Sequence, residues 1–152
     1  MPTMLRALFP AADQPYQGGR APLFFLALIA FVSTARSLVH LLAPDGGAGS
    51  IAGINLGVAG GANIVAVFGQ WGASQLVLAL LQWLVLLRYR FLVPAMLAVL
   101  VLEQLLRLLA GRIKPLQLDT PPPGAYGTYV VLALGLVFLA LALRNSATSK
   151  GE

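Results

Sequence analysis

The stretch Phe91–Gly111, FLVPAMLAVLVLEQLLRLLAG, restricts how this chain can fold more than any other part of it. It is long and apolar enough for a membrane helix, yet its second half carries Glu103, Gln104 and Arg107. Charged side chains are costly in hydrocarbon, so charges inside a span indicate a tertiary or functional site. Glu103 and Arg107 lie one helical turn apart and can partly neutralise each other. Their remaining polar atoms must face protein, ligand or trapped water.

The composition extends this conclusion to the whole chain. Of its 152 residues only 10% are charged and 59% are hydrophobic, whereas a soluble domain usually has about 25% charged residues. So few charges cannot coat a soluble globule, which predicts one compact membrane domain. Because the chain has no cysteine, disulfides, thiolate metal sites and iron–sulfur clusters are excluded.

Four apolar stretches predict four transmembrane helices, and therefore an all-α integral membrane protein with a four-helix bundle. The expected spans are residues 22–43, 64–87, 91–110 and 126–143. An N-terminal segment, residues 1–21, precedes them, and a tail, residues 144–152, follows them. We also expect a short interfacial turn at residues 4–9.

The distribution of basic residues predicts the orientation of the spans. With both termini in the cytoplasm, the inner side holds Arg6, Arg20, Arg88, Arg90, Arg144 and Lys150. The outer side then holds Arg112 and Lys114, opposed by Asp45 and Asp119, which we interpret as ordinary surface charges. Six basic residues inside against two outside favour cytoplasmic termini, in a bacterial inner membrane.

Residues 45–63 are rich in glycine, and two interpretations of them remain open. Gly49, Gly53, Gly57 and Gly61 repeat every four residues, a series that would allow close helix packing. The stretch could thus be a fifth span, or an extracytoplasmic or re-entrant loop packed onto the bundle. We favour the loop, because a fifth span would place Arg88 and Arg90 outside.

Polar residues recur on one face of each of the first three spans. Arg36 and His40 share a face of the first span, and Trp71 and Gln75 share a face of the second. At helical rise, Arg36, Gln75, Glu103 and Arg107 all lie about 17–23 Å from the cytoplasmic edge. We therefore predict one buried cluster, with Arg36 paired directly to Glu103 and Arg107 facing a ligand. The expected site comprises Arg36, His40, Trp71, Gln75, Glu103, Gln104 and Arg107.

Three short motifs resemble those of the DoxX-like small four-helix membrane proteins. They are Phe68-Gly69-Gln70-Trp71-Gly72, Arg88-Tyr89-Arg90 and Glu103-Gln104-Leu105-Leu106-Arg107-Leu108-Leu109. The resemblance covers approximately residues 22–143. It implies a four-helix bundle that acts as an accessory or scaffold subunit and, for some members, works with quinone-linked oxidoreductases.

Two functions remain open from the sequence. The first is a non-catalytic accessory or scaffold subunit, docked on membrane protein partners or a second copy through the uncharged fourth span and the glycine stretch. The alternative is a lipid- or quinone-binding component of a redox chain. In that case the two arginines Arg36 and Arg107 outnumber the one carboxylate, Glu103, and the net positive charge of this cluster would hold a head group between the second and third spans. We expect no catalytic residue, metal or nucleic acid partner, and no cofactor other than a bound lipid or quinone.

Overall fold

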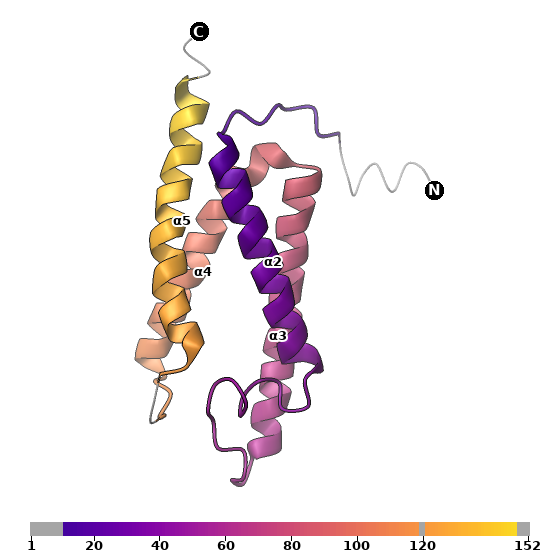
Figure 1. The fold of residues 1–152 in the computed structure, drawn as a ribbon, viewed down its shortest axis with the longest axis vertical. Helices are drawn as coiled ribbons and strands as arrows, with labels where there is room; N and C mark the ends of the chain where they lie inside the picture. The colour runs from indigo at the N-terminus through magenta and orange to yellow at the C-terminus, as the bar shows by residue number, and fades with distance from the viewer. Residues whose placement is uncertain (1–10, 119–120, 149–152) are drawn as a thin grey trace, which may run out of the picture.

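The computed structural model describes residues 11–118 and 121–148, with side chains described as far as residue 144. In this part of the chain the regular structure is entirely helical (Figure 1). It consists of α2 (Arg20–Leu42), α3 (Gly61–Leu87), the short 3₁₀ helix η1 (Arg90–Leu92), α4 (Val93–Ile113) and α5 (Pro123–Thr148). Four helical segments, with η1 and α4 counted as one, are long and apolar enough to cross a membrane. The prediction of four such helices is therefore confirmed.

The predicted interfacial turn at residues 4–9 lies outside the described residues, as do Arg6, Asp119 and Lys150. The bounds of the helices differ slightly from the predicted spans. α3 begins at Gly61 instead of residue 64, and α5 begins at Pro123 instead of residue 126. Proline suits the first turn of a helix, and Pro123 is the first residue of α5.

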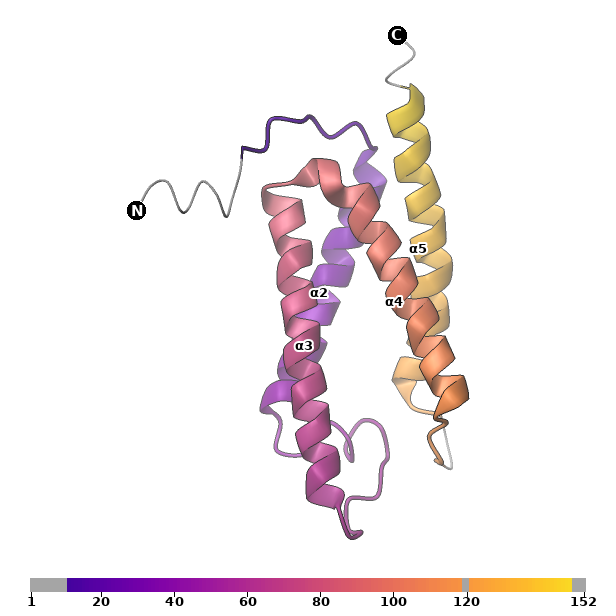
Figure 2. The same ribbon diagram turned by 180° about the vertical axis from the view of Figure 1, so that it is seen from behind.

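The four long helices alternate in direction and form two antiparallel pairs. α2 packs most extensively on α3, and α4 on α5. The two pairs approach each other near the connection between α3 and α4 and diverge toward the opposite end (Figure 2). The start of α2 and the end of α5 lie at the same end of the bundle, which we call the terminal end (Figure 1). The other end carries residues 43–60, the glycine loop, and is called the loop end.

The glycine loop contains turns and irregular backbone, so the fifth-span interpretation does not apply. Gly46, Gly47, Gly53 and Gly60 have positive φ angles between 60° and 93°, which glycine adopts without strain. The helix-packing role predicted for Gly49, Gly53, Gly57 and Gly61 is therefore wrong. A four-residue spacing places residues on one face only in a helix, and of these four only Gly61 is helical, as the first residue of α3.

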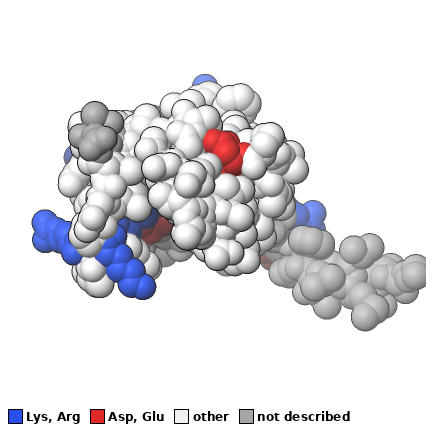
Figure 3. Space-filling model, turned by 90° about the horizontal axis from the view of Figure 1, so that it is seen from below, with Lys and Arg blue, Asp and Glu red and all other residues white. Residues whose placement is uncertain are grey.

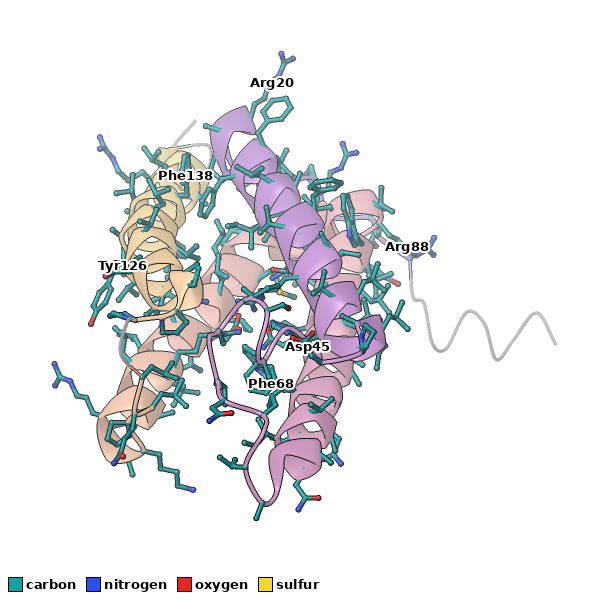
Figure 4. The ribbon with its side chains drawn as sticks, turned by 60° about the horizontal axis from the view of Figure 1, so that its bottom comes forward. Arg20, Asp45, Phe68, Arg88, Tyr126 and Phe138 are labelled. Carbon is teal, nitrogen blue, oxygen red and sulfur yellow. The ribbon has the colours of Figure 1, made fainter. Side chains whose placement is uncertain are left out.

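Asp45 holds the glycine loop in place, which corrects its interpretation as an ordinary surface charge. Its carboxylate accepts the Ser50 N–H at 2.7 Å and the Gly47 N–H at 2.9 Å. These backbone hydrogen bonds, that of Ser50 first, lower the pKa of Asp45 to about 2. The loop also packs on α3, because a Cβ at Gly46 would lie 3.0 Å from the Phe68 Cβ. Asp45 and Phe68 both lie far from Arg20 (Figure 4).

α2 and α3 approach each other closely at Gly72, which the sequence argument did not identify as a packing residue. A Cβ at Gly72 would lie 2.7 Å from the His40 Cβ and 2.8 Å from the Leu41 backbone nitrogen. Only glycine fits at this distance, so Gly72 sets how closely the two helices cross.

The apolar core fills the terminal half of the bundle. Leu26, Val93 and Leu97 are fully buried there, and Phe25 of α2 stacks on Phe138 of α5 with 4.4 Å between ring centroids. The loop half contains most of the polar side chains of α2, α3 and α4, whereas Gln82 of α3 is buried in the terminal half. This division follows the sequence, in which the polar residues of α2 and α4 fall in the second half of each helix.

Candidate functional site: a polar cluster beside a cavity

Gln75 of α3 is the central residue of the polar cluster. Its side-chain oxygen Oε1 accepts a hydrogen bond from Arg36 Nη2 at 2.5 Å and another from Arg107 Nη2 at 2.8 Å. Its Nε2 donates to Glu103 Oε1 at 3.0 Å. One neutral side chain therefore joins three helices and links both arginines to the carboxylate.

Glu103 and Arg107 form an ion pair within α4. Arg107 Nη2 lies 2.8 Å from Glu103 Oε1, and Arg107 Nε donates to the same oxygen at 2.9 Å. Both side chains are about one-fifth exposed, at 21% and 19%. The one-turn spacing seen in the sequence therefore does bring these two charges into contact.

The predicted direct pairing of Arg36 with Glu103 is wrong, because Gln75 lies between them. An amide can accept from a guanidinium and donate to a carboxylate at the same time, so it replaces the direct contact. Arg107, the arginine predicted to face a ligand, is bonded to more protein side chains than Arg36. Arg107 is bonded to both Glu103 and Gln75, whereas Arg36 donates to Gln75 only and its buried Nε has no hydrogen-bond partner among the described residues.

Aromatic rings extend the cluster toward the glycine loop. The guanidinium carbons of Arg36 and Arg107 lie 5.4 Å and 5.1 Å from the Trp71 ring centroid, within the range of cation–π attraction. The His40 ring lies 4.7 Å from Trp71 and 5.7 Å from Phe68. His40 is also fixed by its Nδ1–H, which donates to the Gly46 carbonyl at 2.7 Å. It therefore connects the cluster to the loop.

A cavity of about 220 Å³ adjoins the cluster, between α2, α4 and α5. Its lining includes five polar residues, namely Ser33, Arg36, Glu103, Gln104 and Thr128. The rest of the lining is apolar or glycine, and consists of Ile29, Val32, Leu100, Gly124, Gly127 and Val131. The cavity differs from the predicted position between the second and third spans, since α5 forms one wall and α3 contributes no lining residue.

The α5 wall was not found from the sequence, because that helix has no charged residue before Arg144. A Cβ at Gly124 or Gly127 would meet no heavy atom within 4 Å, so these glycines leave space open. Thr128 is buried, and its hydroxyl donates to the Gly124 carbonyl at 3.0 Å. The sequence signal is the Gly-x-x-Gly-Thr pattern at the start of α5, in which two glycines precede a buried threonine.

The structure thus places six of the seven predicted site residues in one connected cluster, and the seventh, Gln104, in the cavity wall. Among the described residues no group of three or more His, Asp or Glu side chains could hold a metal ion. The cluster offers guanidinium, amide and hydroxyl donors beside an apolar wall. This chemistry suits the binding of a polar head group.

The loop end of the molecule is mostly uncharged on its surface. In the space-filling view from this end, charged atoms of both signs are visible deep in a hollow (Figure 3). The cavity residues Arg36 and Glu103 are only partly buried. Small polar molecules or head groups can therefore approach the charges of the cluster.

Comparisons with protein-family models, with curated proteins and with solved structures gave no match for this chain. The resemblance to DoxX-like proteins therefore stays a prediction.

Proposed function

We propose that this chain is a four-span protein of a bacterial inner membrane that binds the polar head of an amphipathic molecule in the cavity between α2, α4 and α5. The observation that supports it most strongly is the cavity itself, because charged, amide and hydroxyl groups share its wall with aliphatic side chains. A binding site for part of a lipid or a quinone needs this combination of polar anchors and apolar walls.

The proposed orientation places both termini in the cytoplasm. At the terminal end lie Arg20, Arg88, Arg90 and Arg144, and at the loop end Arg112, Lys114 and Asp45. This asymmetry supports a cytoplasmic terminal end. The cavity would then lie in the outer half of the membrane.

Ligand binding has more structural support than the accessory-subunit function expected from the sequence. That expectation relied on the glycine series as a helix-docking face, and residues 49–57 are not helical. Its other support was the fourth span, residues 126–143, which has no charged residue. The exposed side chains of this span, such as Val130 and Val137, are equally suited to lipid. Docking onto other membrane subunits stays a prediction.

Filling the cavity tests the proposal. Gly127→Leu places an aliphatic side chain in the open space of the cavity, where a Cβ meets no atom within 4 Å. Gly111→Leu is the matched control, because a Cβ at helical Gly111 is equally unobstructed and Gly111 does not line the cavity. Both changes replace glycine within a helix by the same residue, so their effects on helix propensity match.

The measurement is native mass spectrometry of each variant in mild detergent, with phosphatidylglycerol, phosphatidylcholine and a ubiquinone added. We expect at least one of these molecules to bind the wild-type protein and the Gly111→Leu variant. The molecule that binds should have an apparent affinity for Gly127→Leu that is at least about tenfold lower. The leucine side chain occupies space in the cavity, so the ligand loses contacts equivalent to those of about one side chain. Equal binding to all three proteins would refute the proposal.

A further inference from the structure

The charge balance of the cluster points to the chemical class of the ligand. The cluster contains two guanidiniums, Arg36 and Arg107, and one carboxylate, Glu103. Arg107 is neutralised by Glu103, at 2.8 Å, so the positive charge of Arg36 is the surplus. Gln75 and Trp71 contact Arg36 but carry no formal charge. A charge that is partly buried among apolar side chains and has no opposite charge of its own is costly, which favours a bound counter-ion.

We infer that the ligand is anionic, and specifically the phosphate head of an acidic phospholipid held by Arg36. This inference rests on the proposed function, since it names the ligand class of the same cavity. Arg36 lines the cavity, and Arg107 does not. A guanidinium has five N–H donors, and the structure records one of those of Arg36 as donated to protein, to Gln75. Donors therefore remain for phosphate oxygens, which a guanidinium fork fits well.

Neutral donors in the wall complete the site. The Gln104 amide and the Ser33 hydroxyl line the cavity beside Arg36. They can donate to the phosphate oxygens that Arg36 does not reach. Glu103 also lines the cavity, and its contacts with Arg107 and Gln75 reduce its repulsion of an anion.

The size and opening of the cavity favour a lipid head over a whole molecule. Its volume of about 220 Å³ is below the roughly 300–1,000 Å³ of pockets that enclose a drug-sized ligand. Val32 lines the cavity and is also 52% exposed, so the cavity opens at the outer surface of α2. A head group can therefore bind inside while its acyl chains remain in the surrounding lipid. A quinone ring would fit this space too, but its carbonyls bring no negative charge.

The test measures head-group preference in delipidated protein in a neutral detergent. The protein carries Trp83→Phe, so that Trp71, the other of its two tryptophans, reports binding beside the cluster. Phosphatidylglycerol, phosphatidylcholine and a ubiquinone are titrated separately, followed by Trp71 fluorescence and by native mass spectrometry. We expect phosphatidylglycerol to bind at least about tenfold more tightly than the other two, which corresponds to one charge-assisted contact.

Two arginine variants test the role of Arg36. Arg36→Gln should weaken phosphatidylglycerol binding at least about tenfold, and phosphatidylcholine binding less, because the choline cation of that head group already offsets the charge of its phosphate. Arg112→Gln is the control, because it removes the same charge from an exposed position at the same end of the bundle, outside the cavity. It should change the affinity less than about twofold. If Arg36→Gln does not fold, Arg36→Lys keeps the charge without the fork and should retain the anion preference at lower affinity.

The outcomes separate this inference from the proposed function. Tighter binding of phosphatidylcholine or ubiquinone, abolished by Gly127→Leu, would overturn the anion inference and leave the cavity as the binding site. Equal losses in Arg36→Gln and Arg112→Gln would also overturn it, because they would reflect general surface charge. Displacement of phosphatidylglycerol by millimolar inorganic phosphate alone would assign the site to free phosphate. Binding that is insensitive to Gly127→Leu for every probe would refute both proposals.

Discussion

Gln75 is the residue whose removal should damage the cluster most, although it is neutral. Gln75→Leu keeps the size of the side chain approximately constant and removes three hydrogen bonds, those with Arg36, Arg107 and Glu103. Interhelical hydrogen bonds in membrane proteins contribute about 0.6 kcal/mol on average and up to about 1.7 kcal/mol. The three together therefore account for about 2–5 kcal/mol of the free energy of unfolding.

The free energy of unfolding can be measured by titrating the protein in dodecylphosphocholine micelles with sodium dodecyl sulfate. Gln70→Leu is the matched control, because Gln70 lies on the same helix but is exposed. It should change the free energy of unfolding by less than about 0.5 kcal/mol. A similar, small effect of Gln75→Leu would mean that Gln75 does not connect the helices.

Combining substitutions at Arg36, Gln75 and Glu103 tests how the charges are linked. Residues in direct contact show coupling energies of about 0.5–3 kcal/mol. We expect the Arg36–Gln75 coupling to exceed the Arg36–Glu103 coupling, because only the first pair is hydrogen bonded. The Arg36–Glu103 coupling should also decrease when Gln75 is leucine. An Arg36–Glu103 coupling that exceeded the other pairwise couplings and was unaffected by Gln75→Leu would mean that the two charged groups are paired directly. That result would refute the bridging role of Gln75.

Three further predictions concern the loop, the helix crossing and the topology. Gly72→Leu should lower the free energy of unfolding by about 1–3 kcal/mol, because even a Cβ there would lie 2.7 Å from His40; Gly111→Leu, measured in the same way, should not. The pKa of Asp45 falls from 3.8 to about 2 in the folded loop, so its carboxylate stabilises the loop above about pH 4, and this is lost as the pH falls toward 2. Amide exchange at Ser50, corrected for intrinsic rates, should therefore accelerate over that range, and an Asp45→Asn variant should exchange fast throughout. For the topology, a cysteine at exposed Ser50 should react with an impermeant thiol reagent from the outside, and one at exposed Gln17 only from the cytoplasm; the opposite result would invert the proposed orientation.

The helices could be predicted from the sequence because their length and apolarity suffice to identify them. Depth along each helix was also computable, since the rise per residue is fixed, and it placed Arg36, Gln75 and Glu103 at one level. Depth does not determine which side chain lies between two others. That depends on how the helices are rotated and how closely they cross, and here Gly72 and Gln75 determine both.

The position of a cavity cannot be predicted from the polar residues of a sequence alone. The cavity exists partly because Gly124 and Gly127 have no side chains, and neither residue carries chemistry that would attract notice. The helix-packing prediction for the glycine series at 49–61 was wrong for a related reason. Its regular spacing assumed a helix, whereas Gly53 and Gly60 adopt positive φ angles that end regular structure.

The arrangement of the cluster also bears on how the protein enters the membrane during synthesis. The N-terminal helices emerge first, and the α2–α3 pair already contains a polar partner for Arg36 in Gln75. Arg107 has Glu103 on its own helix, so α4 can insert with its charges neutralised before it meets α3. The contacts of Gln75 with Glu103 and Arg107 can form only when the two pairs associate. They are therefore complete only when the two pairs have docked in register.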